Sequence, residues 1–354
     1  MLAYILDNSN LRIKDILEFE EYDFREDIDY NDKSSITVAR KPIIADDDFV
    51  FCKDDNNTVF TGICDTYKSS SDNAAYTISL RQKECLFDRQ IFVEHEELIS
   101  GAGIEEFIVQ AIRDNYTASG DTLMDRPYTV MATSHTPVAA RVEADKGVYN
   151  LKTYLGNAKQ YYGIYVDFDF AGNQLVIRVY KKAESVIPID IEVTDISDYT
   201  ETYSVSALVR LLVYWKIPDK EDNNGNTVVG ALTKRRFFLL ADRSITEDIN
   251  NTDRAAGVSK SIYIEVETEE EMLQQVYNEF ASNRYSHKIS FSLNRNSKLY
   301  PTNRFYVGRE CTIKTKSGIR TSMITKSEIK STSGIVALTF GSLKVTLIDK
   351  LRKG

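Results

Sequence analysis

The three histidines are tested first for chemistry, because an imidazole can bind a metal or move a proton near neutral pH. His95, His135 and His287 stand far apart, and none lies in an HxH or HExxH pattern or beside a CxxC pair. This spacing does not predict a zinc site. Glutamates surround His95 in the sequence, and we interpret that segment as an exposed acidic turn before a helix.

Several clusters of carboxylates could bind a hard cation or act as an acid/base pair. Asp46–Asp48, Asp54-Asp55 and the segment 219–226 lack the alternating acidic residues and the closing glutamate of a calcium loop. Glu18–Asp23 is a run of acidic residues, which does not indicate two carboxylates held across a sugar. We interpret the first three segments as hairpin tips or polar loops.

The sequence also lacks a recognisable nucleophile or phosphate-binding loop. Gly101-Ala102-Gly103 precedes a helix and could receive an anion, but the third glycine and a surrounding parallel βαβ unit are missing. Neither a GxSxG element nor a convincing Cys/His pair occurs. We therefore expect a protein that is not an enzyme, with no catalytic residues, no cofactor and no metal.

Composition favours sheets in two or three domains. The chain has 354 residues, is 42% hydrophobic and contains 21 Tyr and 16 Phe, and aromatic residues are common in strands. Cys52, Cys64, Cys85 and Cys311 are too few for a disulfide scaffold, so we expect buried free thiols. A disulfide between Cys52 and Cys64 across a hairpin stays open as the alternative.

Charge is distributed unevenly along the chain. Residues 286–354 hold fourteen Lys/Arg and three Asp/Glu, whereas the whole chain has a net charge of −9. Two solvated faces would explain this, and so would acidic and basic surfaces that meet between copies or face different partners. Specific nucleic-acid binding is not expected, because the sequence shows no basic stripe interleaved with aromatic residues and no recognition motif. No signal peptide and no apolar run of about 18 residues is present, so we expect a soluble protein without stable membrane insertion.

The pattern of apolar residues divides the chain into four segments. Residues 1–95 alternate like short strands and predict a barrel-like domain that Gln90–Val93 completes. Residues 96–185 hold two amphipathic helices, at 103–116 and 150–161, and a hairpin. Residues 186–300 return to strands and contain a helix at 268–282, where Thr268 and Glu271 match a capping box.

The last segment, 301–354, has the clearest strand pattern. Strands are predicted at Glu310–Thr315, Ile319–Ile324 and Ile335–Phe340, and we expect this segment to pack with residues 186–266. Phe340 and Leu338 should point into the core, and Gly341 should permit a bulge or a close backbone approach. The predicted fold class is mainly β with an α/β insert (α+β), with two small antiparallel barrel-like domains that could be diverged structural repeats.

Several segments in this order resemble the baseplate-hub and tail-tip proteins of tailed phages, prophages and phage-tail-like contractile particles. The matching segments are Val59-Phe60-Thr61-Gly62-Ile63, the helix–helix–hairpin insert, the polar run and long strand at 203–214, the helix at 268–282, Tyr306-Val307-Gly308 and Leu338-Thr339-Phe340-Gly341. One departure is Arg210, where the family pattern has Asn. The resemblance covers nearly the whole chain, although each segment alone is weakly specific.

The resemblance implies a homotrimer whose six barrel-like domains form a ring. That ring would adapt a sixfold tail tube to a threefold spike or fibre, within a virion tail or baseplate assembled in the bacterial cytoplasm. The implied partners are a tail tube or distal tail protein, a spike, needle or tail fibre protein, and a tape measure protein. DNA would pass through the lumen without specific binding. Since the sequence stops soon after the last barrel segment, a compact hub of a contractile tail, a prophage or a bacteriocin is favoured.

The resemblance also selects candidate structural or interface residues. The candidate residues are Gly62, Trp215, Gly308, Phe340 and Gly341.

Two alternatives from other functional classes remain open at this point, a peptidoglycan-active tail enzyme and a glycan-binding β-rich module. A zymogram would distinguish the first from a hub, and retention on a glycan resin as a monomer would distinguish the second.

Overall fold

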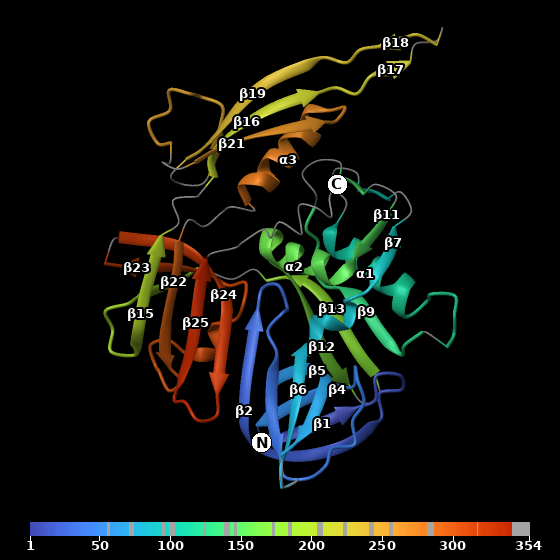
Figure 1. Ribbon diagram of the computed structural model, residues 1–354, viewed down its shortest axis with the longest axis vertical. Coiled ribbons are helices and arrows are strands. Elements are labelled where there is room, and N and C mark those ends of the chain that lie inside the picture. The colour runs from blue at the N-terminus through green and yellow to red at the C-terminus, as the bar shows by residue number, and fades with distance from the viewer. Residues whose placement is uncertain are drawn as a thin grey trace.

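The fold is mainly β, as predicted, and consists of two barrels, a helix-containing insert and a separate sheet (Figure 1). Three α-helices occur in the described part of the chain. The computed structural model describes residues 1–54, 57–70, 74–93, 96–98, 103–123, 125–137, 142–144, 147–171, 174–182, 186–203, 208–221, 225–240, 244–254, 258–281, 287–316 and 318–341.

The N-terminal barrel has the strand order β1-β4-β5-β6-β3-β2, and a pairing of β1 with β2 closes it. Apolar side chains that alternate along these strands fill its interior. Phe24 stacks on Phe60 there, with ring centroids 4.6 Å apart. The strands are β1 (Leu2–Leu6), β2 (Ile13–Asp27), β3 (Ser34–Val38), β4 (Phe49–Asp54), β5 (Asn57–Ser69) and β6 (Tyr76–Gln82).

The terminal barrel combines strands from two distant parts of the sequence. Its order is β14-β23-β24-β25-β22-β15. Its core includes Phe291 and Phe340, whose rings stack 5.0 Å apart. The strands are β14 (Ile187–Asp190), β15 (Ile196–Tyr203), β22 (His287–Asn294), β23 (Glu310–Thr315), β24 (Gly318–Lys330) and β25 (Ile335–Gly341).

The two barrels have the same strand connectivity. If β1 to β6 correspond in order to β14, β15, β22, β23, β24 and β25, five neighbour pairs of one barrel recur in the other. The strand β5 has a bulge between Cys64 and Thr66 against β6, and β24 has one between Ile324 and Lys326 against β25. The barrels differ in two ways: β14 runs parallel to β23 whereas β1 and β4 are antiparallel, and among the described strands β14 and β15 do not form the pair that closes the N-terminal barrel between β1 and β2. They are therefore structural repeats with diverged sequences.

The insert packs two helices against a three-stranded sheet of order β12-β13-β9. Helix α2 begins at Asn150, whose side chain accepts from the Thr153 amide, and ends at Gly163 with a φ of 67°. The predicted helices are thus confirmed. The elements are η1 (Lys83–Phe87), β7 (Gln90–Val93), β8 (Glu96–Leu98), α1 (Ile104–Tyr116), β9 (Tyr128–Ala132), β10 (Val142–Ala144), β11 (Gly147–Asn150), α2 (Leu151–Tyr162), β12 (Ile164–Ala171) and β13 (Gln174–Lys181).

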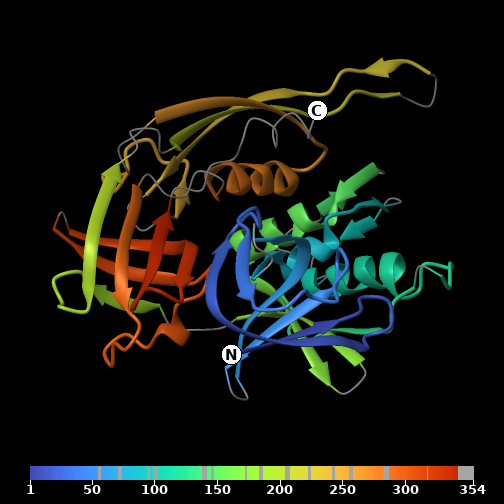
Figure 2. The same cartoon turned by 60° about the horizontal axis from the view of Figure 1, so that its bottom comes forward.

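A separate sheet of order β20-β19-β16-β21 carries helix α3 on one face (Figure 2). Its capping box is confirmed, because the Glu271 amide donates to Thr268 Oγ1 and the Thr268 amide to Glu271 Oε2. No helix among the described residues is long and apolar enough to cross a bilayer. The elements are β16 (Leu208–Lys216), β17 (Lys220–Glu221), β18 (Thr227–Val228), β19 (Leu232–Leu239), β20 (Ile245–Thr246), β21 (Val258–Glu265) and α3 (Glu269–Ala281).

Two expectations about packing need correction. Gln90–Val93 does not complete the N-terminal barrel, because β7 pairs with β11 of the insert and the barrel is closed by β1 and β2. The expected packing of 301–354 with residues 186–266 holds for β14, which pairs with β23, and for β15, which joins the same sheet through β22, but not for the strands between 208 and 265. The latter strands bury their apolar face under α3 instead. Strand alternation identifies strands but not their distant partners.

Candidate functional site

The two barrels are joined edge to edge by β2 and β24. Five residues of each strand pair in antiparallel register, with Asp23 opposite Lys330, Arg25 opposite Glu328 and Asp27 opposite Lys326. Because of this pairing, strands of both barrels belong to one continuous twelve-stranded sheet. The junction therefore fixes how the two repeats are oriented within one chain.

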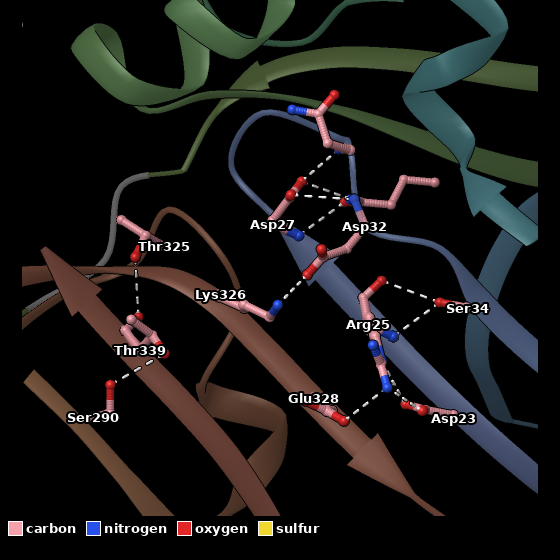
Figure 3. A network of polar contacts seen from close by, with 12 residues as sticks. Asp23, Arg25, Asp27, Asp32, Ser34, Ser290, Thr325, Lys326, Glu328 and Thr339 are labelled. Atoms are coloured by element: carbon pink, nitrogen blue, oxygen red, sulfur yellow. Dashed lines mark hydrogen bonds and ion pairs between the residues drawn. The ribbon is translucent and has the colours of Figure 1, made fainter. Parts of the chain in front are cut away.

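Ion pairs cross this junction (Figure 3). The Arg25 guanidinium lies 2.6 Å from Asp23 and 3.3 Å from Glu328, while Lys326 Nζ lies 2.6 Å from Asp32. The hydrogen bond to Asp23 raises the pKa of Arg25 further, so this side chain is charged at any working pH. Acidic β2 and basic β24 thus meet inside one chain, at a place that the uneven charge did not identify.

The backbone on either side of the junction is also held by hydrogen bonds. The side chain of Asp27 accepts from the amides of Asn31 and Asp32, which shapes the turn after β2. The Ile28 amide donates to the carbonyl of Thr325, and the Thr325 hydroxyl donates to the carbonyl of Thr339 in Figure 3. Thr325 occupies the bulge of β24, so the bulge connects β2 with the interior of the terminal barrel.

A second contact joins the insert to the terminal barrel through aromatic rings. Tyr165 of β12 packs edge-on against Tyr306, with ring centroids 5.6 Å apart. The Lys182 ammonium lies 3.5 Å from the centroid of the Tyr306 ring, a cation–π distance. Burial lowers the pKa of Lys182, and the positive charges of Arg309, Lys83 and Lys159 lower it further. This contact holds a lysine in a strongly cationic neighbourhood.

Gly308 lies at this contact. Its φ is +96°, and a Cβ would stand 2.5 Å from the Tyr165 hydroxyl and 3.1 Å from Cγ of Lys159. Its amide donates to the carbonyl of Ile324 at 2.7 Å. Glycine is therefore required here for both the left-handed backbone and the close approach of the insert.

Two ion pairs lie near the same contact, a buried one between Lys159 and Glu84 and a partly exposed one between Lys83 and Asp167. Lys83 Nζ is 2.8 Å from Asp167 Oδ1, and Lys159 Nζ is 3.6 Å from Glu84. Burial alone would raise the pKa of Asp167, but the charge and hydrogen bond of Lys83 outweigh it and lower the pKa. These pairs connect η1 at the end of the N-terminal barrel to the insert.

Phe340 and Gly341 lie at the end of β25, in the terminal barrel. Phe340 is fully buried, Leu338 is 1% exposed and Thr339 is only partly buried, which agrees with the predicted alternation. Gly341 has a φ of +71°, and a Cβ would lie 2.2 Å from the carbonyl oxygen of His287. The close backbone approach that the sequence predicts at this glycine is therefore confirmed.

The other two candidates lie elsewhere. Gly62 is in β5, where a Cβ would be 2.8 Å from the carbonyl oxygen of Arg81 and 2.8 Å from the Phe60 ring. Trp215 is in β16, and its indole donates to the carbonyl of Val266 at 3.0 Å. The five candidates thus lie in three different parts of the fold, and only Gly308, Phe340 and Gly341 share the terminal barrel.

The residues first considered for chemistry have protein partners. Asp46 and Asp47 receive hydrogen bonds from Arg81, and Asp48 from Lys14. His135 lies 3.0 Å from Glu106. Within the described ranges, no group of three or more His, Cys, Asp or Glu side chains could hold a metal ion. His95, Asp55, Asn224 and Gly101-Ala102 lie outside the described residues.

All four cysteines are buried free thiols, so the alternative of a Cys52–Cys64 disulfide is not realised. In the hairpin, Cys52 lies opposite Phe60 and Cys64 lies opposite Leu80. Burial raises the pKa of the Cys311 thiol to about 12, and that of Cys85 to about 11. These thiols are therefore protonated, unreactive packing groups.

Solved structures with a similar fold include tail proteins of prophages. No protein-family model matches the sequence, and neither does any curated protein. The prophage tail protein gp18 from Listeria monocytogenes EGD-e superposes with a TM-score of 0.57 at 12% identity, over 100% of this chain and 99% of that one.

Two further solved structures agree. The 43 kDa tail protein of prophage MuSo2 from Shewanella oneidensis has a TM-score of 0.55 at 11% identity, covering 96% of this chain and 98% of that one. The tail protein from Neisseria meningitidis MC58 has a TM-score of 0.52 at 11% identity, covering 96% and 95%. The chain therefore has the fold of the prophage tail proteins, over essentially its whole length.

Proposed function

We propose that this chain is a structural hub protein at the tail tip or baseplate of a phage or phage-tail-like particle, in which three copies form a ring. The observation that carries the proposal is the pair of barrels with one connectivity, joined edge to edge through β2 and β24. Three such chains would present six similar barrels. A ring of this kind matches a sixfold tube on one side and a threefold spike on the other.

The fold shared with prophage tail proteins supports a role within a tail. In this role the ring contacts a tail tube or distal tail protein above and a spike, needle or tail fibre protein below. A tape measure protein would end near the ring. The chain is located in the virion tail or baseplate, after assembly in the bacterial cytoplasm, and DNA passes through its lumen without specific binding.

The proposed role is not enzymatic and requires no cofactor. The carboxylates of Asp46–Asp48, which could have bound a cation, are used in ion pairs with Lys14 and Arg81. The polar contacts with the clearest geometry instead join one domain to the next. This use of polar groups supports a protein that transmits force and geometry between its neighbours in the tail.

Mass photometry of the purified chain tests the proposal. A trimer is expected, either for the chain alone or after addition of the tube and spike proteins. Co-sedimentation with the assembled tube should then retain one trimer at a tube end, so that its six barrels meet the six subunits of the terminal tube ring. A chain that stays monomeric at every concentration and does not join tube or spike proteins would rule out the proposed role.

A further inference from the structure

Each barrel offers two strand edges on opposite sides. In the closed order of the N-terminal barrel, β2 and β5 are three strands apart in either direction. Their counterparts in the terminal barrel are β15 and β24. Within the chain, β2 of the N-terminal barrel already pairs with β24 of the terminal barrel. This contact uses one of the two edges of each barrel, and the other two edges are β5 and β15.

The edge of β5 is built like the edge of β24. In β24, β23 pairs with Gly318–Met323 and β2 pairs with Lys326–Lys330 on the same edge, beyond the bulge. In β5, β4 pairs with residues 57–63 on the corresponding edge. Beyond the bulge, among the strands that the structure describes, none adjoins Thr66–Ser69 on that edge.

This stretch of β5 is also open to solvent. The side chains of Thr66, Tyr67, Lys68 and Ser69 are all exposed. The open groove of about 660 Å³ that Tyr67, Lys68, Ser69, Tyr76 and Lys41 line lies on the side of β6, which already pairs with this stretch, so it does not mark the edge in question. The opposite side is a strand edge with exposed side chains, and such an edge can accept one more strand.

The matching edge is β15, the counterpart of β2. It stands at the end of the strand order, and β22 is the strand that pairs with it in the described chain. In Figure 1, β15 lies on the side of the terminal barrel away from β24 and the N-terminal barrel. Thr200 and Thr202 are exposed on it.

We propose that the second half of β15 pairs in antiparallel register with the last residues of β5 in a second copy of this chain. This inference rests on the proposed ring and names its contact between subunits. When the bulge of β5 is placed on the bulge of β24, Lys68 takes the position of Glu328. The strand β2 pairs with β3 as β15 pairs with β22, and when these two strand pairs are superposed, Thr202 takes the position of Arg25. Because Arg25 lies opposite Glu328, Thr202 lies opposite Lys68 of the second copy.

The second copy is the occupant because the chain already forms the same contact between its own repeats. The two edges differ, so the interface is head to tail and generates a ring or a filament. The residues are compatible, since the proposed register sets a threonine against a lysine and no like charges face each other. Within the chain, the corresponding residues Arg25 and Glu328 form an ion pair. Thr202 and Lys68 cannot form one, because threonine carries no charge.

Cysteine cross-linking tests the register. Opposite Cα atoms in an antiparallel pair are about 4.5–5.5 Å apart, within the range of a disulfide. A chain that carries both Thr202→Cys and Lys68→Cys should give linked dimers and trimers on oxidation, and a mixture of the two single variants should give linked dimers. The native cysteines are buried and should stay unmodified.

Two controls match this design. Arg25→Cys with Glu328→Cys occupies the equivalent register within one chain, so it should close a disulfide inside the monomer and confirm that such a pair can form. In the second control, Tyr67→Cys is used in place of Lys68→Cys. Tyr67 is the preceding residue of β5, and its side chain points to the other face of the strand, so it should link poorly with Thr202→Cys.

The outcomes separate the inference from the proposed function. A linked trimer with Lys68→Cys and little linkage with Tyr67→Cys supports both. A trimer by mass photometry that does not link through these positions, or links equally through Tyr67→Cys, overturns the strand pairing and leaves the hub role standing. A chain that remains monomeric and unlinked at every concentration, with or without tube and spike proteins, overturns both.

Discussion

Gly341 lies directly against the backbone of His287 in the terminal barrel. A Cβ on Gly341 would be 2.2 Å from the His287 carbonyl oxygen, and the φ of Gly341 is +71°. The two residues stand at adjoining ends of β25 and β22, where Gly341 pairs with Lys288. The Thr325 hydroxyl also donates to the Gly341 carbonyl at 3.0 Å. The last residue of β25 is therefore fixed from three directions.

We expect Gly341→Ala to destabilise the fold by more than about 1–2 kcal/mol, the usual cost of a left-handed conformation for a residue with a Cβ. The contact with the His287 carbonyl adds to that cost, because the obstacle is backbone and cannot rotate away. Urea denaturation measures the effect. Gly334→Ala is the control, since Gly334 lies in open space. Equal midpoints for the two variants would contradict the reason given for Gly341.

The ion pair between the barrels should contribute modestly to stability. The side chains of Arg25 and Glu328 are 36% and 22% exposed, so solvent screens their attraction. We expect a coupling free energy of about 0.2–1 kcal/mol in a double-mutant cycle of Arg25→Gln and Glu328→Gln. It should shrink in 1 M salt. A coupling of zero at low salt would show that this ion pair adds nothing to the backbone pairing and the Lys326–Asp32 contact.

Local signals predicted the helices well, because each signal acts within a few residues. The capping box predicted at Thr268 is found in the structure, and the glycine that follows the helix predicted at 150–161, Gly163, ends α2. The spacing of Met272, Val276, Tyr277 and Phe280 in the sequence predicts one apolar face for this helix, but Tyr277 is 53% exposed. Met272, Val276 and Phe280 already cover the sheet, so the apolar stripe is narrower than the sequence suggests.

The contacts between domains could not be predicted from the sequence. The Arg25–Glu328 pair joins residues about 300 positions apart, and nothing in either strand specifies the other. The uneven charge was open to two solvated faces, to surfaces that meet between copies or to surfaces that face different partners, and none of these alternatives is the meeting of β2 and β24 within one chain. Two barrel-like domains were expected and a diverged repeat was considered, but the shared connectivity and bulges that establish the repeat leave no recognisable similarity in the sequence.

Acid stability should depend on Asp167. Its pKa lies below the ordinary value of 3.8, mainly because Lys83 offsets the cost of burial. A carboxylate with a lowered pKa in the folded state stabilises the fold above pH 4 and loses this effect as the pH falls through its folded pKa. Asp167→Asn should therefore lower the melting temperature at pH 7 and narrow its gap to the wild type near pH 2. Asp169→Asn, on the same strand and paired with Arg178, is the control.

We expect no dependence on a bound metal and no hydrolytic activity. The Asp46–Asp48 segment has Arg81 and Lys14 as partners, which already neutralise its carboxylates. EDTA should leave the melting temperature unchanged, and a peptidoglycan zymogram should show no clearing. A downward shift of several degrees that calcium reverses would instead reveal a metal site among the acidic loops.

Phe340 should be essential to the terminal barrel. Its ring is fully buried, stacks on Phe291 at 5.0 Å and lies opposite both Ile289 and Ile324 in the adjoining strands. Truncation to alanine should cost about 3–5 kcal/mol, as removal of a core aromatic ring does.

That cost approaches the total stability of many domains, so Phe340→Ala should be insoluble or unable to assemble. Phe340→Leu retains much of the side-chain volume and should stay soluble with a lowered melting temperature, which gives a measurable value if alanine prevents folding. Ile319→Ala is the matched control, because Ile319 lies in the same barrel but is 69% exposed. Soluble fraction, thermal melting and mass photometry measure the three variants. If Phe340→Ala melts and assembles like Ile319→Ala, the packing around this ring does not hold the barrel together, and the edges on which the ring of subunits depends must be held by the strand ladders alone.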